Sequence, residues 1–179
     1  APFAFTGGTF PGTAGSCTVT LNGAASCTVD VTYSPIATGL QTDIMDFSYN
    51  NGAATVCVTH NLQGTGAAPA LLTITETNPY DYGNVTQGAN TDYIFTINNT
   101  GAVPATTVGG SGLTSPFSFT GGSYPGTGGN CGVTIANGAT CTIEVNFAPI
   151  AAAVGTDTID LNYNNGVTGV TSSRDVTGT

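Results

Sequence analysis

The sequence predicts an all-β fold made of tandem β-sandwich modules. Three observations support this prediction: apolar and polar residues alternate with a period of two, turns rich in Gly, Asn and Pro separate these stretches, and one motif occurs twice. Residues 2–12 read PFAFTGGTFPG and residues 116–126 read PFSFTGGSYPG, at an offset of 116 − 2 = 114. Side chains two residues apart share one face of a strand, so the alternating stretches are expected to be strands.

The repeat with this 114-residue offset extends well beyond the first motif. By direct count, 30 of the 64 positions aligned between residues 2–65 and 116–179 are identical, without a gap. The matches include cysteine pairs and the triplet NNG at residues 50–52 and 164–166, which low-complexity composition does not reproduce. The chain is therefore expected to hold tandem modules of one kind.

The two modules are not expected to be equally complete. Residues 70–179 form a full module, whereas residues 1–66 match only its later part and contain nothing that corresponds to residues 71–114. Two explanations stay open: the chain is a window of a longer polypeptide, or another chain donates the absent strands. A partial module with a permanently open edge is disfavoured, because open edges invite association.

Seven strands are expected in the complete module. In chain order they lie at about 71–76, 93–98, 103–108, 117–120, 141–147, 159–163 and 168–177. The turn signals between them are Asn78-Pro79, Asn99-Thr100-Gly101, Tyr124-Pro125-Gly126 and Asn164-Asn165-Gly166. Seven short strands in about 110 residues, without an amphipathic helix, are typical of an immunoglobulin-like sandwich. A barrel is the alternative, but it would not need tandem repetition.

The alternation also predicts which side chains face the core. In the complete module the inward residues are Tyr93, Phe95, Ile97, Cys141, Ile143, Val145, Phe147, Ile159, Leu161 and Tyr163. In the partial module the inward residues are Val29, Val31, Tyr33, Met45, Phe47, Tyr49, Val56 and Val58. Polar residues occupy the positions between them, so each strand is expected to be buried on one face only.

The chain resembles the Hydin-like (ASH-type) Ig-like domains in several motifs. Residues 80–85 read YDYGNV and residues 93–101 read YIFTINNTG, followed by Phe147-Ala148-Pro149 and a closing Gly178-Thr179. This is similar to the tandem form found in bacterial surface proteins of the choice-of-anchor D type. The resemblance implies the sandwich fold, and it implies a spacer or interaction module.

Composition excludes several functional classes. Charged residues make up 6% of the chain, against about 25% in an average soluble domain. The formal charge of −9, with one Arg and no Lys, argues against nucleic acid and against anionic membrane surfaces. No apolar run reaches the roughly 20 residues of a membrane-spanning helix, so membrane insertion of this segment is not expected.

Four cysteines are expected to form two disulfides. Cys17 and Cys27 are ten residues apart, and so are Cys131 and Cys141. A bridge across such a short loop stabilises the fold by about 3 kcal/mol and indicates an oxidising compartment. A zinc site would need closer cysteine spacing and histidine partners.

Cys57 has no partner in this scheme, and its counterpart is Thr171. Strand alternation places it on the outer face, so it is a candidate for an interchain disulfide. The alternative is a free, half-buried cysteine that packs as a small apolar residue.

No catalytic, cofactor or metal site is expected. His60 corresponds to Arg174, so the two modules do not share a reaction that needs histidine. Asp43 and Asp46 recur as Asp157 and Asp160. Because such residues lie three apart on a strand, they point to opposite faces and are expected to be solvated rather than to bind Ca²⁺.

Two functions fit these observations. The first is a structural repeat module of an extracellular or cell-surface fibre, filament or stalk, whose partners are copies of itself or neighbouring modules. The second is an adhesin that binds glycan or protein through the loops at one sandwich end, with Tyr80, Tyr82, Tyr124 and Phe10 as exposed aromatic candidates. Tyr124 and Phe10 occupy the same repeat position, and the alternative for both is that they only cover the core.

Overall fold

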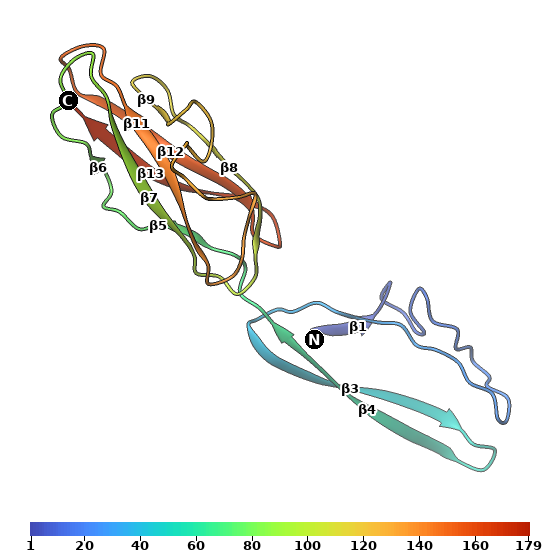
Figure 1. Ribbon diagram of the computed structural model, residues 1–179. Helices are drawn as coiled ribbons and strands as arrows, with labels where there is room; N and C mark the ends of the chain where they lie inside the picture. Colours follow the sequence, from blue (N-terminus) through green and yellow to red (C-terminus); the bar gives the residue numbers. More distant parts are fainter. The chain divides into compact units, whose positions relative to one another are not determined.

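The computed structural model describes all 179 residues and contains strands, turns and loops but no helix (Figure 1). The chain divides into two compact units, which comprise Ala1–Ala67 and Ala68–Thr179. Thirteen strands are distributed over four sheets. The all-β fold class is therefore confirmed.

The second unit contains nine strands. They are β5 (Leu72–Ile74), β6 (Tyr80–Asp81), β7 (Thr91–Asn99), β8 (Ala105–Ser111), β9 (Phe117–Phe119), β10 (Thr134–Ile135), β11 (Thr140–Phe147), β12 (Gly155–Asn164) and β13 (Gly169–Gly178). Each expected strand is present, with shifted bounds. The two-residue strands β6 and β10 were not expected, because two residues are too few for an alternating pattern.

These strands form two sheets. One has the order β5-β7-β11-β9, and the other has the order β10-β8-β12-β13-β6. All pairings are antiparallel except that of β6 with β13, which is parallel. The pairing of β8 with β12 changes register between Asn162 and Asn164, where the regular ladder is interrupted.

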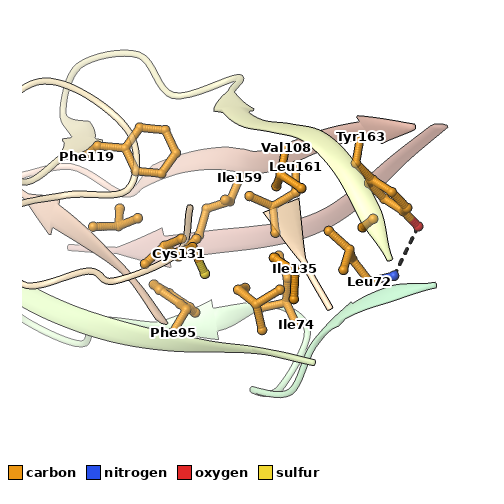
Figure 2. Close-up of a cluster of buried hydrophobic side chains, with 14 of the residues drawn as sticks. Leu72, Ile74, Phe95, Val108, Phe119, Cys131, Ile135, Ile159, Leu161 and Tyr163 are labelled. Atoms are coloured by element: carbon orange, nitrogen blue, oxygen red, sulfur yellow. Dashed lines mark hydrogen bonds between the residues drawn. The ribbon is translucent and has the colours of Figure 1, made fainter. Parts of the chain in front are cut away.

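Apolar side chains from both sheets fill the space between them (Figure 2). On β11 the buried residues alternate with partly exposed ones, and Ile143, Val145 and Phe147 are all fully buried. Ile159 and Leu161 on β12 are fully buried in the same way. The period of two thus produces one apolar face on each sheet, and the two faces form the core of an immunoglobulin-like sandwich.

The first unit contains four strands in two separate pairs. They are β1 (Phe3–Phe5), β2 (Val31–Tyr33), β3 (Gly39–Asn50) and β4 (Thr55–Gly66). β1 pairs with β2, and β3 pairs with β4, both antiparallel. Neither pair has a third strand.

The loops of the two units make equivalent hydrogen bonds, each within its own unit. The Thr6 N–H donates to the Asp30 carbonyl at 3.0 Å, as the Thr120 N–H donates to the Glu144 carbonyl at 3.1 Å. The Ser34 N–H likewise donates to the carbonyl of Pro2 at 2.7 Å. In the second unit, the corresponding bond joins the Ala148 N–H to the carbonyl of Pro116 at 2.9 Å. The local conformations around the repeated motif therefore coincide.

The expectation that the first unit buries its inward residues is wrong. None of its side chains is buried, and Val58, expected to face a core, is 52% exposed. Val58 does lie opposite Phe47 in the ladder, on the same face, so the alternation is as expected. Phe10 covers Phe47 on that face, but the unit has no counterpart of β7 or β8, so Val58 stays exposed.

The strand expected around Val29 is also shorter than predicted. β11 pairs with β7 along its whole length, but with β9 only over Val145–Phe147. The first unit has a counterpart of β9, which is β1, and none of β7. Val29 therefore has no ladder partner and lies outside β2, half-exposed.

Candidate interaction surfaces

Two disulfide bonds tie a loop to the strand region that follows it. They join Cys17 to Cys27 and Cys131 to Cys141, each with a Cα–Cα distance of 4.9 Å. Cys131 is buried among the core residues, and the Cys131 N–H donates to the Thr142 carbonyl at 3.0 Å. The bridge therefore fixes a loop to β11 at a point where the backbone is already paired.

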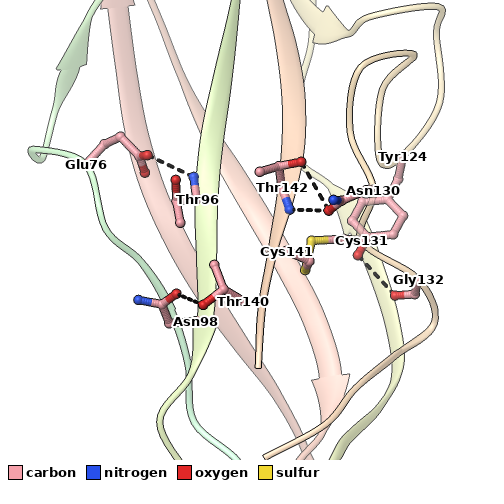
Figure 3. The surroundings of a disulfide bond; sticks show 10 residues. All are labelled: Glu76, Thr96, Asn98, Tyr124, Asn130, Cys131, Gly132, Thr140, Cys141 and Thr142. Carbon is pink, nitrogen blue, oxygen red and sulfur yellow. Dashed lines mark hydrogen bonds between the residues drawn. A yellow bond between two sulfur atoms is a disulfide. The ribbon is translucent and has the colours of Figure 1, made fainter. Parts of the chain in front are cut away.

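Side chains around the second disulfide support the same loop (Figure 3). The Asn130 Oδ1 accepts bonds from the Thr142 N–H at 2.8 Å and from the Thr142 hydroxyl at 3.1 Å. In the first unit Ser16 takes this role, because its hydroxyl accepts from the Thr28 N–H at 2.9 Å. Asn130 and Ser16 thus accept from equivalent backbone N–H groups, each beside the disulfide of its own unit.

Cys57 is a free cysteine with an exposed side chain. It lies opposite Ser48 in the β3–β4 ladder, whereas Val56 and Val58 lie opposite Tyr49 and Phe47. Since successive residues point to opposite faces, the thiol lies on the face away from the apolar one. It is thus not half-buried as the packing alternative required.

Most of the expected exposed aromatic residues pack against the core instead. The Tyr82 hydroxyl donates to the Val145 carbonyl at 2.8 Å, and its ring lies 5.6 Å from that of Phe147. Tyr124 meets Phe119 edge-on at 5.8 Å. Tyr80 is half-buried in contact with Tyr82, so of the four candidates only Phe10, at 45%, is exposed.

Burial changes the ionisation of these tyrosines. Desolvation raises the pKa of Tyr124 to about 12. It also raises the pKa of Tyr80 to about 12, with the neighbouring Tyr93 contributing. The pKa of Tyr82 is raised still further, again mainly by desolvation. Burial disfavours the charged phenolate, so these three side chains keep their protons to higher pH than a free tyrosine does.

The aspartates predicted to lie on opposite strand faces bond to neighbouring strands and loops. The Asp157 Oδ2 accepts from the Thr114 N–H at 2.6 Å, and the Asp160 Oδ1 accepts from the Ser173 hydroxyl at 2.6 Å. A shallow cavity of about 580 Å³ next to Asp157 is also lined by Asp175. The Asp175 Oδ1 accepts from the Thr158 hydroxyl at 2.9 Å. These carboxylates therefore hold the sheet and its loops together.

Other potential site residues are dispersed. No group of three or more His, Cys, Asp or Glu side chains is placed to hold a metal ion. His60 is exposed on β4, opposite Met45. The structure also contains no helix that is long and apolar enough to cross a membrane.

Sequence reasoning treated Asn99 as a turn residue and missed its structural role. Asn99 is 1% exposed, and its Nδ2 donates to the carbonyls of Val103 and Ile135 at 3.0 and 3.1 Å. Its Oδ1 accepts from the N–H groups of Leu71 and Gly101 at 3.2 and 3.1 Å. One buried side chain thus connects the residue before β5, the β7–β8 turn and β10. The only signal in the sequence is an Asn two residues before a Gly, which also suits an ordinary turn.

Comparison with known proteins identifies the family of the second unit. Residues 72–178 match the family described as HYDIN/CFA65/VesB-like, Ig-like domain. No curated protein matches the chain.

Three solved structures are similar at low identity. The VesB protease of Vibrio cholerae is 18% identical, with 62% of this chain and 31% of that chain covered and a TM-score of 0.48. A Porphyromonas gingivalis protein of unknown function is 11% identical, with 83% and 70% covered and a TM-score of 0.48. The ASH/PapD-like domain 7 of human CEP192 is 11% identical, with 63% and 85% covered and a TM-score of 0.42.

The likeness to VesB covers less than a third of the protease chain, so no activity is carried over from it. The family match is stronger evidence, because it spans 178 − 72 + 1 = 107 of the 179 residues. It also covers every strand of the second unit, from β5 to β13. The chain therefore belongs to the HYDIN/CFA65/VesB-like Ig-like domain family.

Proposed function

We propose that this chain is a non-catalytic structural module of an extracellular or cell-surface stalk or fibre, in which sandwich units follow one another in series. The observation that carries the proposal is the shortness of the link between the two units. Gly66 pairs with Gly39 inside the first unit. The Ala68 carbonyl accepts a hydrogen bond from the Ala102 N–H at 3.1 Å inside the second unit. Only Ala67 lies between these two anchored residues.

A one-residue link favours a spacer over a hinged pair of domains. Flexible linkers gain their reach from many freely rotating residues, and a single residue supplies very few. Units joined in this way are suited to hold a distance between the two ends of a chain. A tandem array of the choice-of-anchor D type, anchored at a bacterial surface, is the setting that we infer.

The disulfides support an oxidising location. Both bridges close ten-residue separations, and they occur at equivalent places in the two units. Disulfides persist outside the cytosol and are rare inside it.

An adhesin role is the weaker candidate. It would need exposed aromatic or polar groups that converge on a loop surface, but Tyr82 and Tyr124 are engaged in contacts with the core. The carboxylates at the shallow cavity are used in hydrogen bonds within the unit. We therefore give the structural role precedence.

Negative-stain microscopy of native material tests this proposal. We expect thin extended particles that stay intact under non-reducing conditions. Uniformly compact single particles would contradict the stalk, and specific hits on a glycan array with the full chain would favour the adhesin instead.

A further inference from the structure

The first unit exposes apolar side chains whose counterparts in the second unit are buried by strands of that same second unit. Tyr49 is 51% exposed, whereas its counterpart Tyr163 is 4% exposed. Leu21 is 55% exposed, whereas its counterpart Ile135 is 3% exposed. The other apolar and aromatic residues of this open face are Phe3, Phe5, Val29, Val31, Tyr33, Met45, Phe47, Val56, Val58, His60 and Leu62, and Asp43 lies on the same face opposite Leu62.

Each of the four strands of the same unit also has one unpaired edge. In the second unit, β11 pairs with both β9 and β7, and β12 pairs with both β13 and β8. In the first unit, β2 pairs only with β1, and β3 pairs only with β4. The free edges of β2 and β3 therefore correspond to the edges at which β7 and β8 bind. Unpaired backbone edges beside an apolar face favour the addition of strands.

We propose that the open face of the first unit binds a segment of this same repeat that has the residue pattern of Leu71–Thr114 and supplies the counterparts of β7 and β8. In the second unit the corresponding segment precedes Pro116 in the chain. This inference rests on the proposed series of sandwich units and names the partner that completes one of them. A folded second copy is not the donor, because its own residues 71–114 are held in its own sandwich.

The chemistry of the segment matches the face. In the second unit its buried apolar side chains are Leu72, Ile74, Phe95, Ile97, Ala105 and Val108. They cover β11 and β12, whose counterparts in the first unit carry residues of similar size. Leu161, for example, corresponds to Phe47, and Ile143 corresponds to Val29. A face made mainly of apolar side chains beside unpaired backbone edges does not suit a charged ligand.

The register of the bound segment follows from the second unit. Ile143 is opposite Phe95, and Val145 is opposite Tyr93. Subtracting 114 places a Phe95-type residue opposite Val29 and extends β2 toward Cys27. In the other sheet, Leu161 is opposite Gly110, so a Gly110-type residue would lie opposite Phe47.

The test is a graft on the full chain. A second copy of residues 68–114 is placed directly ahead of Ala1, and amide hydrogen exchange is measured with and without it. We expect exchange in β2 and β3 to slow by more than about a hundredfold, since opening a core strand costs close to the global unfolding free energy. The strands β11 and β12 serve as the internal standard for a folded second unit.

A matched control carries Phe95→Asp and Ile97→Asp in the grafted copy only. We expect this control to exchange as fast as the chain without a graft. The proposal is overturned if both grafts leave β2 and β3 equally unprotected while β11 stays protected. It is also overturned if the ungrafted chain is a dimer with β3 already protected, because the faces of two copies then cover each other.

The result of the graft experiment does not depend on whether the protein forms a stalk. If the graft protects β2 and β3 but native particles are compact, the stalk function is contradicted and the proposed binding segment is supported. If native particles are extended but the graft does not protect β2 and β3, the stalk function is supported and the proposed binding segment is contradicted.

Discussion

The backbone N–H of Leu72 donates a hydrogen bond to the hydroxyl of Tyr163 at 3.1 Å (Figure 2). The bond connects β5 in one sheet to β12 in the other, in the buried part of the sandwich. Tyr49, at the equivalent place in the first unit, has no such partner and is half-exposed. The tyrosine at this position therefore joins the two sheets in the second unit and is exposed in the first.

Replacing Tyr163 tests this connection between the sheets. Tyr163→Phe keeps the ring but leaves the Leu72 N–H without its acceptor, which we expect to lower the free energy of unfolding by about 1–3 kcal/mol. Tyr49→Phe is the matched control, with an expected change within about 0.5 kcal/mol. Urea denaturation followed by circular dichroism measures both. Equal effects of the two substitutions would show that the interlayer bond contributes nothing.

Asn99 is expected to be among the most sensitive polar residues of the chain. Asn99→Ala removes a side chain that makes four hydrogen bonds in the buried region, so we expect a loss of more than about 3 kcal/mol. The neighbouring Asn98→Ala loses one partly exposed bond to the Thr140 hydroxyl and should cost less than about 1 kcal/mol. Thermal unfolding of the two variants under the same conditions checks the difference. Similar melting temperatures would refute the role of Asn99.

Gly178 is expected to tolerate no side chain. A Cβ at this position would lie 2.5 Å from the Cε1 of Phe147, a fully buried ring that has no room to move. We expect Gly178→Ala to destabilise the second unit by about 1–3 kcal/mol through overpacking. Gly169→Ala on the same strand meets nothing within 4 Å and is the control. Limited proteolysis rates of the two variants compare them, and equal rates would contradict the packing argument.

Alkaline pH is expected to weaken the second unit. The pKa of Tyr124 rises from 10.0 to about 12 on folding, so the folded state retains a proton that the unfolded state releases first. The stabilisation is complete below pH 10 and is lost as the pH rises toward about 12. Stability curves of wild type and Tyr124→Phe measure this effect, and the variant should lose less stability across that window. Parallel curves would show that Tyr124 does not titrate with unfolding.

The alternation of side chains predicted the strands of the second unit well, because that signal is local. Phe95, Ile143 and Leu161 are buried as the period of two requires. The exposure of Val58 and the absence of a strand at Val29 could not be read from alternation. Both depend on whether a distant strand pairs with the segment, and the pattern of a strand is the same with or without its partner.

The interaction residues were harder to predict than the fold. Alternation left open whether Tyr124 is exposed or covers the core, and Tyr82 was a candidate for an exposed residue, because a tyrosine has both an apolar ring and a polar hydroxyl and suits either environment. The Tyr82 hydroxyl meets the Val145 carbonyl, 63 residues away in the chain. Asn99 was missed for the same reason, since its bond to the Ile135 carbonyl is made across 36 residues.

The contrast between one closed and one open sandwich is the central claim, and native-state hydrogen exchange of the unmodified chain tests it most directly. We predict slow exchange in β11, β12 and β13, and fast exchange in β2, β3 and β4 at the same pH and temperature. Protection of β3 equal to that of β12 in a monomeric chain would contradict the account.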